Sequence, residues 1–257
     1  TLHVSMEDIT SYKIVRQSLD ARKKPELFYV YSVDVSLKGQ LERKICKRVN
    51  NKNIMLSEEN GYSFSPDKKP ESSSRPVVAG SGPAGLFCAW LLARCGMQPL
   101  ILERGDKVEE RIKKVTKFWE GGCLDEESNV QFGEGGAGTF SDGKLNTTVK
   151  DPKGRNLQVL KLFVEAGAPE EILYQQKPHL GTDQLVSIVK NLRTKIEQMG
   201  GQFMFGAKLT DISEKNGCLN AVEINGNQWL CTDTLILAIG HSARDTFRML
   251  WERGVSM

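Results

Sequence analysis

The sequence lacks the patterns that would assign it to several specialised classes of protein. Its six cysteines form no C-x-x-C pair and show no metal-ligand spacing. No run approaches the roughly twenty apolar residues of a transmembrane helix, and no secretory signal is visible. The net charge of +3 is slight, and lysines and arginines are interspersed with acids, so no nucleic-acid footprint or polybasic membrane patch is predicted.

Unpaired cysteines in this context predict buried, reduced thiols and a reducing intracellular compartment, with cytoplasm and plastid both open. The chain begins without Met and stops just after a helix-like segment, at Gly254–Met257. We therefore expect a fragment, truncated at one or both ends, and a transit peptide upstream would not be visible.

The stretch Arg75–Gly105, RPVVAGSGPAGLFCAWLLARCGMQPLILERG, predicts a strand, a glycine turn, a helix and a second strand that ends in an acid. Glycines there let the chain turn tightly, let backbone amides approach a pyrophosphate, and let the helix lie close to the strand. Glu103 is placed to accept hydrogen bonds from both hydroxyls of an adenosine ribose. The predicted cofactor-binding turn comprises Gly80, Ser81, Gly82, Pro83, Ala84 and Gly85.

A second glycine-rich stretch, Gly133–Gly138, fits the same spacing in a different context. No strong strand precedes it, and Thr139–Gly143 after it is typical of a turn, not of a helix. A dinucleotide motif needs both neighbours, so by sequence alone only the first stretch predicts a nucleotide site. The loop-like region 121–153, which contains this second stretch, is long for an insertion within an α/β unit. Loops of such length are more often functional than not.

The remaining patterns predict an α/β fold: a parallel nucleotide-binding sheet with helices and a three-stranded β-meander, preceded by a small αβ domain. Period-two alternation over Ser11–Leu37 indicates an antiparallel pair of strands. Asn-Gly turns at 216–217 and 225–226 separate the meander strands, and Thr234–Gly240 reads as a buried parallel strand. We expect the small domain at 1–56, a linker at 57–74 and a cofactor-binding domain at 75–257.

This order of elements, closing with Ala-x-Gly, resembles the FAD-binding domain of the glutathione-reductase-like flavoproteins. From Arg75 onward the sequence resembles more closely a family of uncharacterised FAD-dependent dehydrogenases of bacteria and plants. The resemblance covers most of the chain. It is carried by GSGPAGLFCAWLLA, LERGDKVEER, ESNVQFGEGGAGTFSDGKL, FVEAGAPEEILYQQKPHLGTDQL and LILAIGHSARDTF.

The resemblance implies a non-covalently bound FAD, with Glu103 at the adenosine ribose and the backbone of Leu209 at the adenine. It implies that Gly240 closes a turn over the cofactor. A further set would lie toward the pyrophosphate, ribitol or isoalloxazine: Gly135, Gly136, Ser141 and Lys144. The family's wider superfamily often has a redox disulfide and a second NAD(P)H fingerprint; this sequence has neither, so hydride transfer would fall to the flavin alone.

Two candidate catalytic residues follow from the loops most like the family. Lys144 could stabilise the negative charge of a reduced flavin, and His179 could act as an acid or base near neutral pH; for His179 a structural role is the alternative. His241 follows a predicted strand end, where a cofactor contact is expected. Arg104 could suggest a 2′-phosphate, but the neighbouring carboxylate of Glu103 would repel one, so an unphosphorylated adenosine is favoured.

The sequence thus predicts a FAD-dependent oxidoreductase, with NADH or NADPH possible as the electron donor. Two alternatives stay open: an NAD-dependent dehydrogenase, which shares the glycine motif, and a non-catalytic flavin-binding or sensing module. The substrate or electron acceptor is an unidentified small molecule, no nucleic-acid or membrane partner is expected, and the oligomeric state is open.

Overall fold

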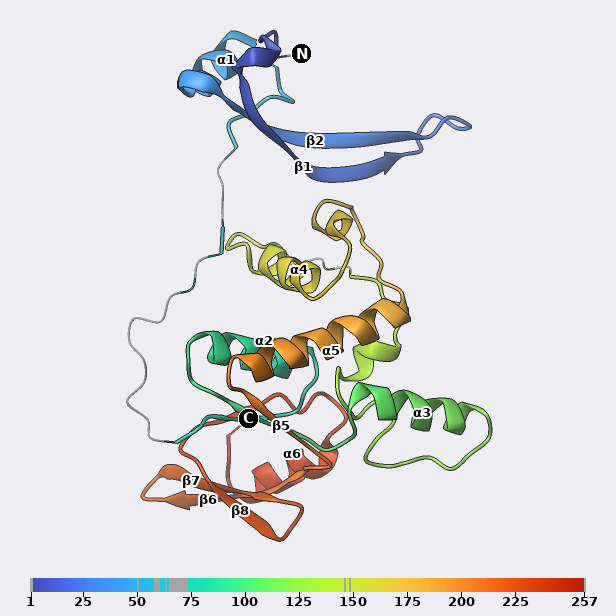
Figure 1. Ribbon diagram of the computed structural model, residues 1–257, viewed down its shortest axis with the longest axis vertical. Coiled ribbons are helices and arrows are strands. Elements are labelled where there is room, and N and C mark those ends of the chain that lie inside the picture. The colour runs from blue at the N-terminus through green and yellow to red at the C-terminus, as the bar shows by residue number, and fades with distance from the viewer. Residues whose placement is uncertain are drawn as a thin grey trace. The chain divides into compact units, whose positions relative to one another are not determined.

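Two compact units make up the protein in the computed structural model, which describes residues 2–49, 51–57, 61–62, 64, 74–145, 147 and 149–256 (Figure 1). The first unit comprises Thr1–Ser63 and Lys144–His179, and the second comprises Phe64–Gly143 and Leu180–Met257. Residues 144–179, which the sequence analysis assigned to the cofactor-binding domain, therefore pack with the N-terminal segment. Most of the predicted linker at 57–74 lies outside the described residues.

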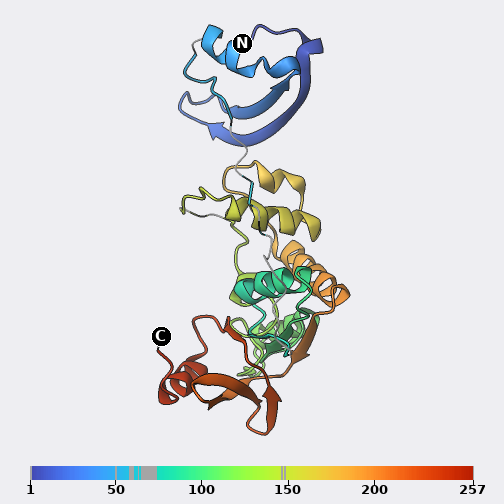
Figure 2. The same cartoon turned by 90° about the vertical axis from the view of Figure 1, so that its left-hand side faces the viewer.

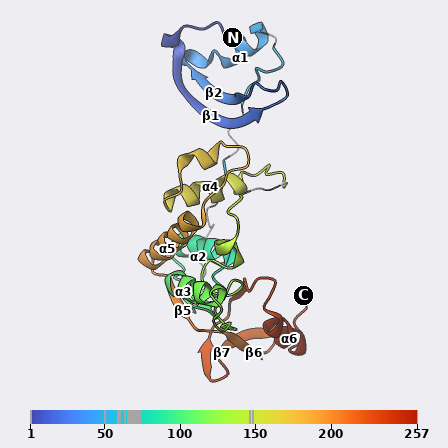
Figure 3. The same ribbon diagram turned by 90° about the vertical axis from the view of Figure 1, so that its right-hand side faces the viewer.

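The first unit is built on a long antiparallel hairpin. Strands β1 (Ile9–Asp20) and β2 (Phe28–Leu37) pair over their length, as the period-two pattern predicted. Helix α1 (Glu42–Val49) follows a short 3₁₀ turn, η2 (Lys38–Gln40), and buries Ile45. The views in Figure 2 and Figure 3 both show α1 on the hollow side of the bent hairpin. A second 3₁₀ turn, η1 (Met6–Asp8), precedes β1.

An excursion from the other unit completes this N-terminal unit. It contains helix α4 (Arg155–Glu165) and the 3₁₀ turn η4 (Glu170–Leu173). The amide of Gln17 donates to the carbonyl of Tyr174 at 2.7 Å, and the amide of Gln176 donates to the carbonyl of Gln17 at 2.9 Å. Because these bonds continue the edge of β1, the excursion is tied to the hairpin by backbone pairing.

The second unit contains a parallel sheet in the order β5-β4-β3-β9. Its central strands carry apolar side chains on both faces, which is typical of a sheet covered on both sides. Val78 and Ile101 are fully buried, as is the small residue Ala89 of the helix that follows β3. Helices α2 and α5 pack side by side (Figure 1). The bounds are β3 (Val77–Ala79), β4 (Leu100–Glu103), β5 (Gln202–Phe205), β9 (Leu235–Leu237), α2 (Pro83–Arg94) and α5 (Thr182–Gln198).

The predicted meander packs against this sheet. Strands β6 (Leu209–Lys215), β7 (Cys218–Ile224) and β8 (Gln228–Cys231) form a three-stranded antiparallel sheet. Asn216-Gly217 and Asn225-Gly226 all have positive φ angles of 56° to 79°, the conformation of a type I′ hairpin turn. One buried cluster joins the two sheets: Val77, Ala79, Leu100, Leu102, Ala207, Leu209, Val222 and Ile224.

The last strand differs from the sequence-based expectation of a buried strand over 234–240. Strand β9 spans only Leu235–Leu237 and pairs with β3 alone, so within the described residues it is an edge strand. Leu237 is accordingly 41% exposed. The apolar run predicted the strand, but the number of its neighbours depends on the sheet order.

Three further elements frame the carboxyl ends of the parallel strands. Helix α3 (Val108–Trp119) follows β4, helix α6 (Arg244–Glu252) follows β9 and packs on β6, and the 3₁₀ turn η3 (Ala137–Phe140) lies in the glycine-rich region. Apart from η3, the described residues between α3 and α4 form no helix or strand, as the loop-like composition predicted. None of the helices in the described part of the chain is both long and apolar enough to cross a membrane.

Candidate functional site

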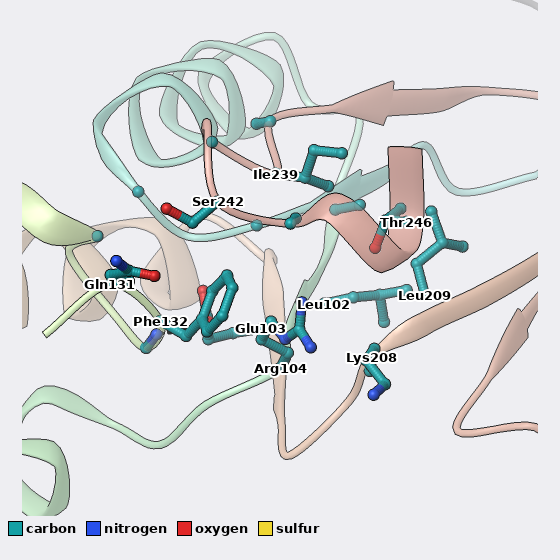
Figure 4. Close-up of a pocket in the computed structure, with 18 of the residues that line it drawn as sticks. Leu102, Glu103, Arg104, Gln131, Phe132, Lys208, Leu209, Ile239, Ser242 and Thr246 are labelled. Atoms are coloured by element: carbon teal, nitrogen blue, oxygen red, sulfur yellow. Dashed lines mark hydrogen bonds between the residues drawn. The ribbon is translucent and has the colours of Figure 1, made fainter. Parts of the chain in front are cut away.

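A cavity of about 420 Å³ opens at the carboxyl ends of β3, β4 and β9 in the second unit (Figure 4). This edge is where ligands bind in open α/β sheets, and the volume lies in the usual range of small-molecule sites. Side chains from the glycine turn, the meander and the start of α6 contribute to its wall. Ten residues expected at the cofactor line it: Gly80, Gly82, Pro83, Ala84, Glu103, Arg104, Gly136, Leu209, Gly240 and His241.

The glycine turn is shaped by close backbone contacts that exclude side chains. A Cβ atom on Gly85 would overlap the carbonyl oxygen of Gly80, and one on Gly80 would overlap the carbonyl oxygen of Ala238. The turn leads directly into α2, which has Gly82 as its N-cap and Pro83 at its first position, with no side chain capping it. Gly82, Pro83 and Ala84 line the cavity, and a helix start without a side-chain cap offers its amides to an anion.

The second glycine motif packs against the first. The amide of Gly135 donates to the carbonyl of Ser81 at 2.9 Å, and a Cβ on Gly136 would lie 3.0 Å from the Cα of Gly82. Gly136 has a φ of +65°, which favours glycine. The stretch that the sequence reading set aside as a motif match thus forms one wall of the cavity beside the turn.

Glu103 joins three of these segments. One carboxylate oxygen accepts from the amide and the hydroxyl of Ser81, at 2.9 and 2.6 Å. The other accepts from the amides of Gly105 and Gly133, at 2.9 and 3.0 Å. The residue is 4% exposed, and these four bonds use the roughly four acceptor positions of a carboxylate. A ribose hydroxyl at Glu103 would therefore have to compete with a donor of the protein.

Arg111 holds the glycine-rich loop in place, a role that the sequence reading missed. Its guanidinium is fully buried and donates to five backbone carbonyls at 2.7 to 3.3 Å, while also lying 4.8 Å from the centroid of the Phe140 ring. Burial lowers the pKa of Arg111 to about 10, with the charges of Glu103 and Glu134 acting in the opposite direction. The carbonyls belong to Asn129, Val130, Gly133, Glu134 and Gly136.

The i, i+3 and i+4 pattern of apolar residues along α3 gave no sign of the role of Arg111. The signal available was an arginine beside Ile112, on the apolar side of that helix. A charged residue in that position is buried only if it is paired or hydrogen-bonded.

A second buried charge lies behind the same loop. Glu134 is fully buried; one carboxylate oxygen accepts from the amide of Val108 and from Arg193, both at 2.8 Å. Its other oxygen has no hydrogen-bond partner among the described residues. Burial raises the pKa of Glu134 to about 7, although the Val108 amide and the charge of Arg193 oppose the shift.

Two basic side chains, Arg104 and Lys208, line the cavity beside Glu103 (Figure 4). Both are paired with the carboxylates of Glu127 and Asp245. Arg104 donates from Nε to Glu127 at 2.6 Å and from both terminal nitrogens to Asp245 at 3.0 and 2.8 Å. Lys208 donates to Glu127 at 2.6 Å and lies 3.6 Å from Asp245. Partial burial alone would raise the pKa of Asp245, but its bonds to Arg104 and to the Thr246 amide lower it to about 2.

The remaining predicted residues lie outside the lining of this cavity. Ser81 and Gly135 are buried behind it, as their bonds above show, and the Ser141 hydroxyl donates to the carbonyl of Gly138 at 2.7 Å. Lys144 and His179 form an isolated antiparallel bridge with each other. Both belong to the first unit, so the structure brings the two candidate catalytic residues together but places them in a different unit from the cavity.

Comparison with known families gives two matches. Residues 78–114 match the NAD(P)-binding Rossmann-like domain. This region includes the glycine turn, α2, β4 and Glu103, so the sequence match and the parallel sheet agree on the fold. Residues 1–36 match a domain of unknown function (DUF8436).

An uncharacterized protein of Clostridium beijerinckii is 46% identical over 256 residues, which is 100% of this chain and 47% of the relative. The chain thus spans about half the length of the relative it matches. Among solved structures, THI4 of Thermovibrio ammonificans is 18% identical with a TM-score of 0.44, covering 71% of this chain and 63% of that one. Thioredoxin reductase of Lactococcus lactis is 15% identical with a TM-score of 0.35, covering 63% and 34%.

Proposed function

We propose that this protein is a FAD-dependent oxidoreductase whose second unit binds the ADP part of a non-covalently held flavin. The observation that carries the proposal is the cavity itself, which joins a side-chain-free glycine turn, the uncapped start of α2 and the carboxylate-bearing end of β4. A dinucleotide needs amides for its pyrophosphate, which the turn and the helix start offer, and a carboxylate near its ribose, which the end of β4 offers.

The residues fit such a group. Gly80, Gly82 and Gly136 line the cavity with backbone atoms alone, so a pyrophosphate could approach the amides of the turn. Close backbone neighbours leave no room for a Cβ on Gly80 and little on Gly136. Leu209, at the start of the meander, supplies an apolar wall toward the adenine. Gly240 and His241 line the side formed after β9. When bound, the flavin would supply hydride or electron transfer; the chain binds it, orients it and shields it from water.

Lys144 and His179 remain our candidates for charge stabilisation and proton transfer at the flavin. A backbone bridge keeps the two residues adjacent within the first unit. Substituting His179 by Ala or Gln is expected to slow flavin reduction without changing FAD affinity. A loss of affinity with normal reduction would instead indicate a structural role.

An NAD-dependent dehydrogenase is the second candidate, because residues 78–114 match an NAD(P)-binding domain. The meander favours FAD: in the flavoproteins that the sequence resembles, such a meander follows the nucleotide-binding sheet. A non-catalytic flavin-binding module is the third candidate.

Titration of the cofactor-free protein with FAD and with NAD⁺, each followed by calorimetry, separates the first two. We expect saturable FAD binding that is displaced by ADP, and visible flavin absorbance in the purified protein. NAD⁺ binding without FAD binding would overturn the proposal. Rapid reduction of bound flavin by NADH or NADPH, followed by turnover with an acceptor, would exclude the non-catalytic module.

A further inference from the structure

Arg104 and Lys208 line the cavity beside Glu103, where a dinucleotide site distinguishes adenosine from adenosine 2′-phosphate (Figure 4). With Glu127 and Asp245, to which both are paired, they form a charge cluster. In Rossmann-like sites the acid at the end of the second strand faces the ribose, and an arginine nearby accommodates a 2′-phosphate when one is present. Arg104 directly follows that acid, and both Arg104 and Lys208 line the cavity. By position alone, this pair of cations would predict a 2′-phosphorylated ligand.

The contacts point the other way. Three of the five N–H donors of Arg104 are taken by two carboxylates, one from the loop after α3 and one from the first turn of α6. Lys208 is bonded to the same two acids. The guanidinium lies 4.1 Å from the centroid of the Phe132 ring, which further restricts its orientation.

The charges of the cluster cancel, two positive against two negative, so the pair of cations offers no net positive charge to a phosphate. A 2′-phosphate would add negative charge beside these carboxylates and would have to compete with them for Arg104. The displaced carboxylates of Glu127 and Asp245 are only half-exposed, so leaving them unpaired beside the phosphate is costly.

We propose that Glu127 and Asp245 are specificity-determining residues that neutralise Arg104 and Lys208 and so select an adenosine ribose without a 2′-phosphate. This inference rests on the proposed ADP site and deepens it, because it predicts exclusion of NADP-type ligands from the cavity. Glu127 and Asp245, which lie far apart in the sequence, would thus determine ligand specificity, which the glycine motif alone does not predict.

Calorimetric titration of the cofactor-free protein with ADP-ribose and with 2′-phospho-ADP-ribose tests the inference, because the two ligands differ only at the 2′ position. We expect ADP-ribose to bind about tenfold more tightly or better. In the double variant Glu127→Gln, Asp245→Asn, the freed cations should bind the 2′-phosphate. The ratio of the two dissociation constants should therefore shift by about tenfold in favour of 2′-phospho-ADP-ribose. Glu110→Gln, which removes a surface partner of Lys113 on α3, is the control and should leave the ratio unchanged.

Equal or tighter binding of the 2′-phosphorylated ligand by the unsubstituted protein would overturn the inference while leaving the ADP site intact. An unchanged ratio in the double variant would also overturn it, provided the melting curve shows a folded protein. Should the double variant fail to fold, Asp245→Asn alone makes the same test, with a smaller shift expected. Binding of neither ligand would instead overturn the proposed ADP site, and the inference with it.

Discussion

Replacing Arg111 by Lys tests whether one buried guanidinium holds the glycine-rich wall of the cavity. Lysine keeps the charge but has a single ammonium group with three donors, whereas the arginine serves five carbonyls spread over residues 129–136. At least two buried carbonyls would lose their partner. Each unpaired carbonyl costs about 1–3 kcal/mol, so the loss of two should lower the free energy of unfolding by about 2–6 kcal/mol.

Two measurements follow the effect. Urea denaturation reports the free energy of unfolding, and amide hydrogen exchange reports local opening; exchange at residues 129–136 should accelerate in the variant. FAD affinity should fall as well, because Gly133 and Gly136 line the cavity. The matched control is Arg94→Lys, an exposed arginine over the Trp90 ring on α2, for which a change within about 0.5 kcal/mol is expected. Unchanged exchange and unchanged unfolding in Arg111→Lys would refute the assigned role.

Three further substitutions have defined outcomes. Glu103→Ala removes four buried hydrogen bonds, so it should lower the free energy of unfolding by about 2–4 kcal/mol. It should also weaken FAD binding by about 1.5–3 kcal/mol. If calorimetry gives an unchanged dissociation constant for FAD, Glu103 is not part of the site. Gly85→Ala places a Cβ on the carbonyl oxygen of Gly80, so the free energy of unfolding, measured by heat or urea, should fall by about 3 kcal/mol. The control Gly138→Ala, with no atom within 4 Å of the new Cβ, should be tolerated. Equal effects would contradict the close packing of the turn. Between pH 4.5 and about 7, Glu134 holds a proton in the folded protein that it loses in the unfolded chain, because burial raises its pKa. The free energy of unfolding should therefore fall by about 3 kcal/mol as pH rises through this window. In urea denaturation across pH, Glu134→Gln should abolish that fall, while the exposed control Glu120→Gln should retain it.

Features that depend on a few consecutive residues were predicted from the sequence, whereas contacts between distant segments were not. The Arg75–Gly105 unit is observed as predicted because each step in it is local: an apolar strand, glycines at positions where a Cβ would collide, and a helix begun by Pro83. The Asn-Gly turns of the meander were also predicted from the sequence. A type I′ turn needs positive φ at two successive residues, and Asn-Gly favours that conformation.

The division into units did not follow the order of the chain. Residues 144–179 return to the N-terminal hairpin because the edge of β1 at Gln17 offers backbone partners to residues 174–176. Such pairing depends on which strand edge is open, and period-two alternation in the sequence carries no information about it.

Composition and local pattern by themselves determined the α/β class, the nucleotide-binding turn and the position of Glu103 after the second strand. Only the tertiary structure decided that the carboxylate of Glu103 would join both glycine motifs, that Arg111 would be buried beneath them, and that Glu127 and Asp245 would neutralise Arg104. The physical reason is distance along the chain. Helix starts and tight turns depend on a few consecutive residues, whereas a buried charge is stable only where segments far apart in sequence bring it partners.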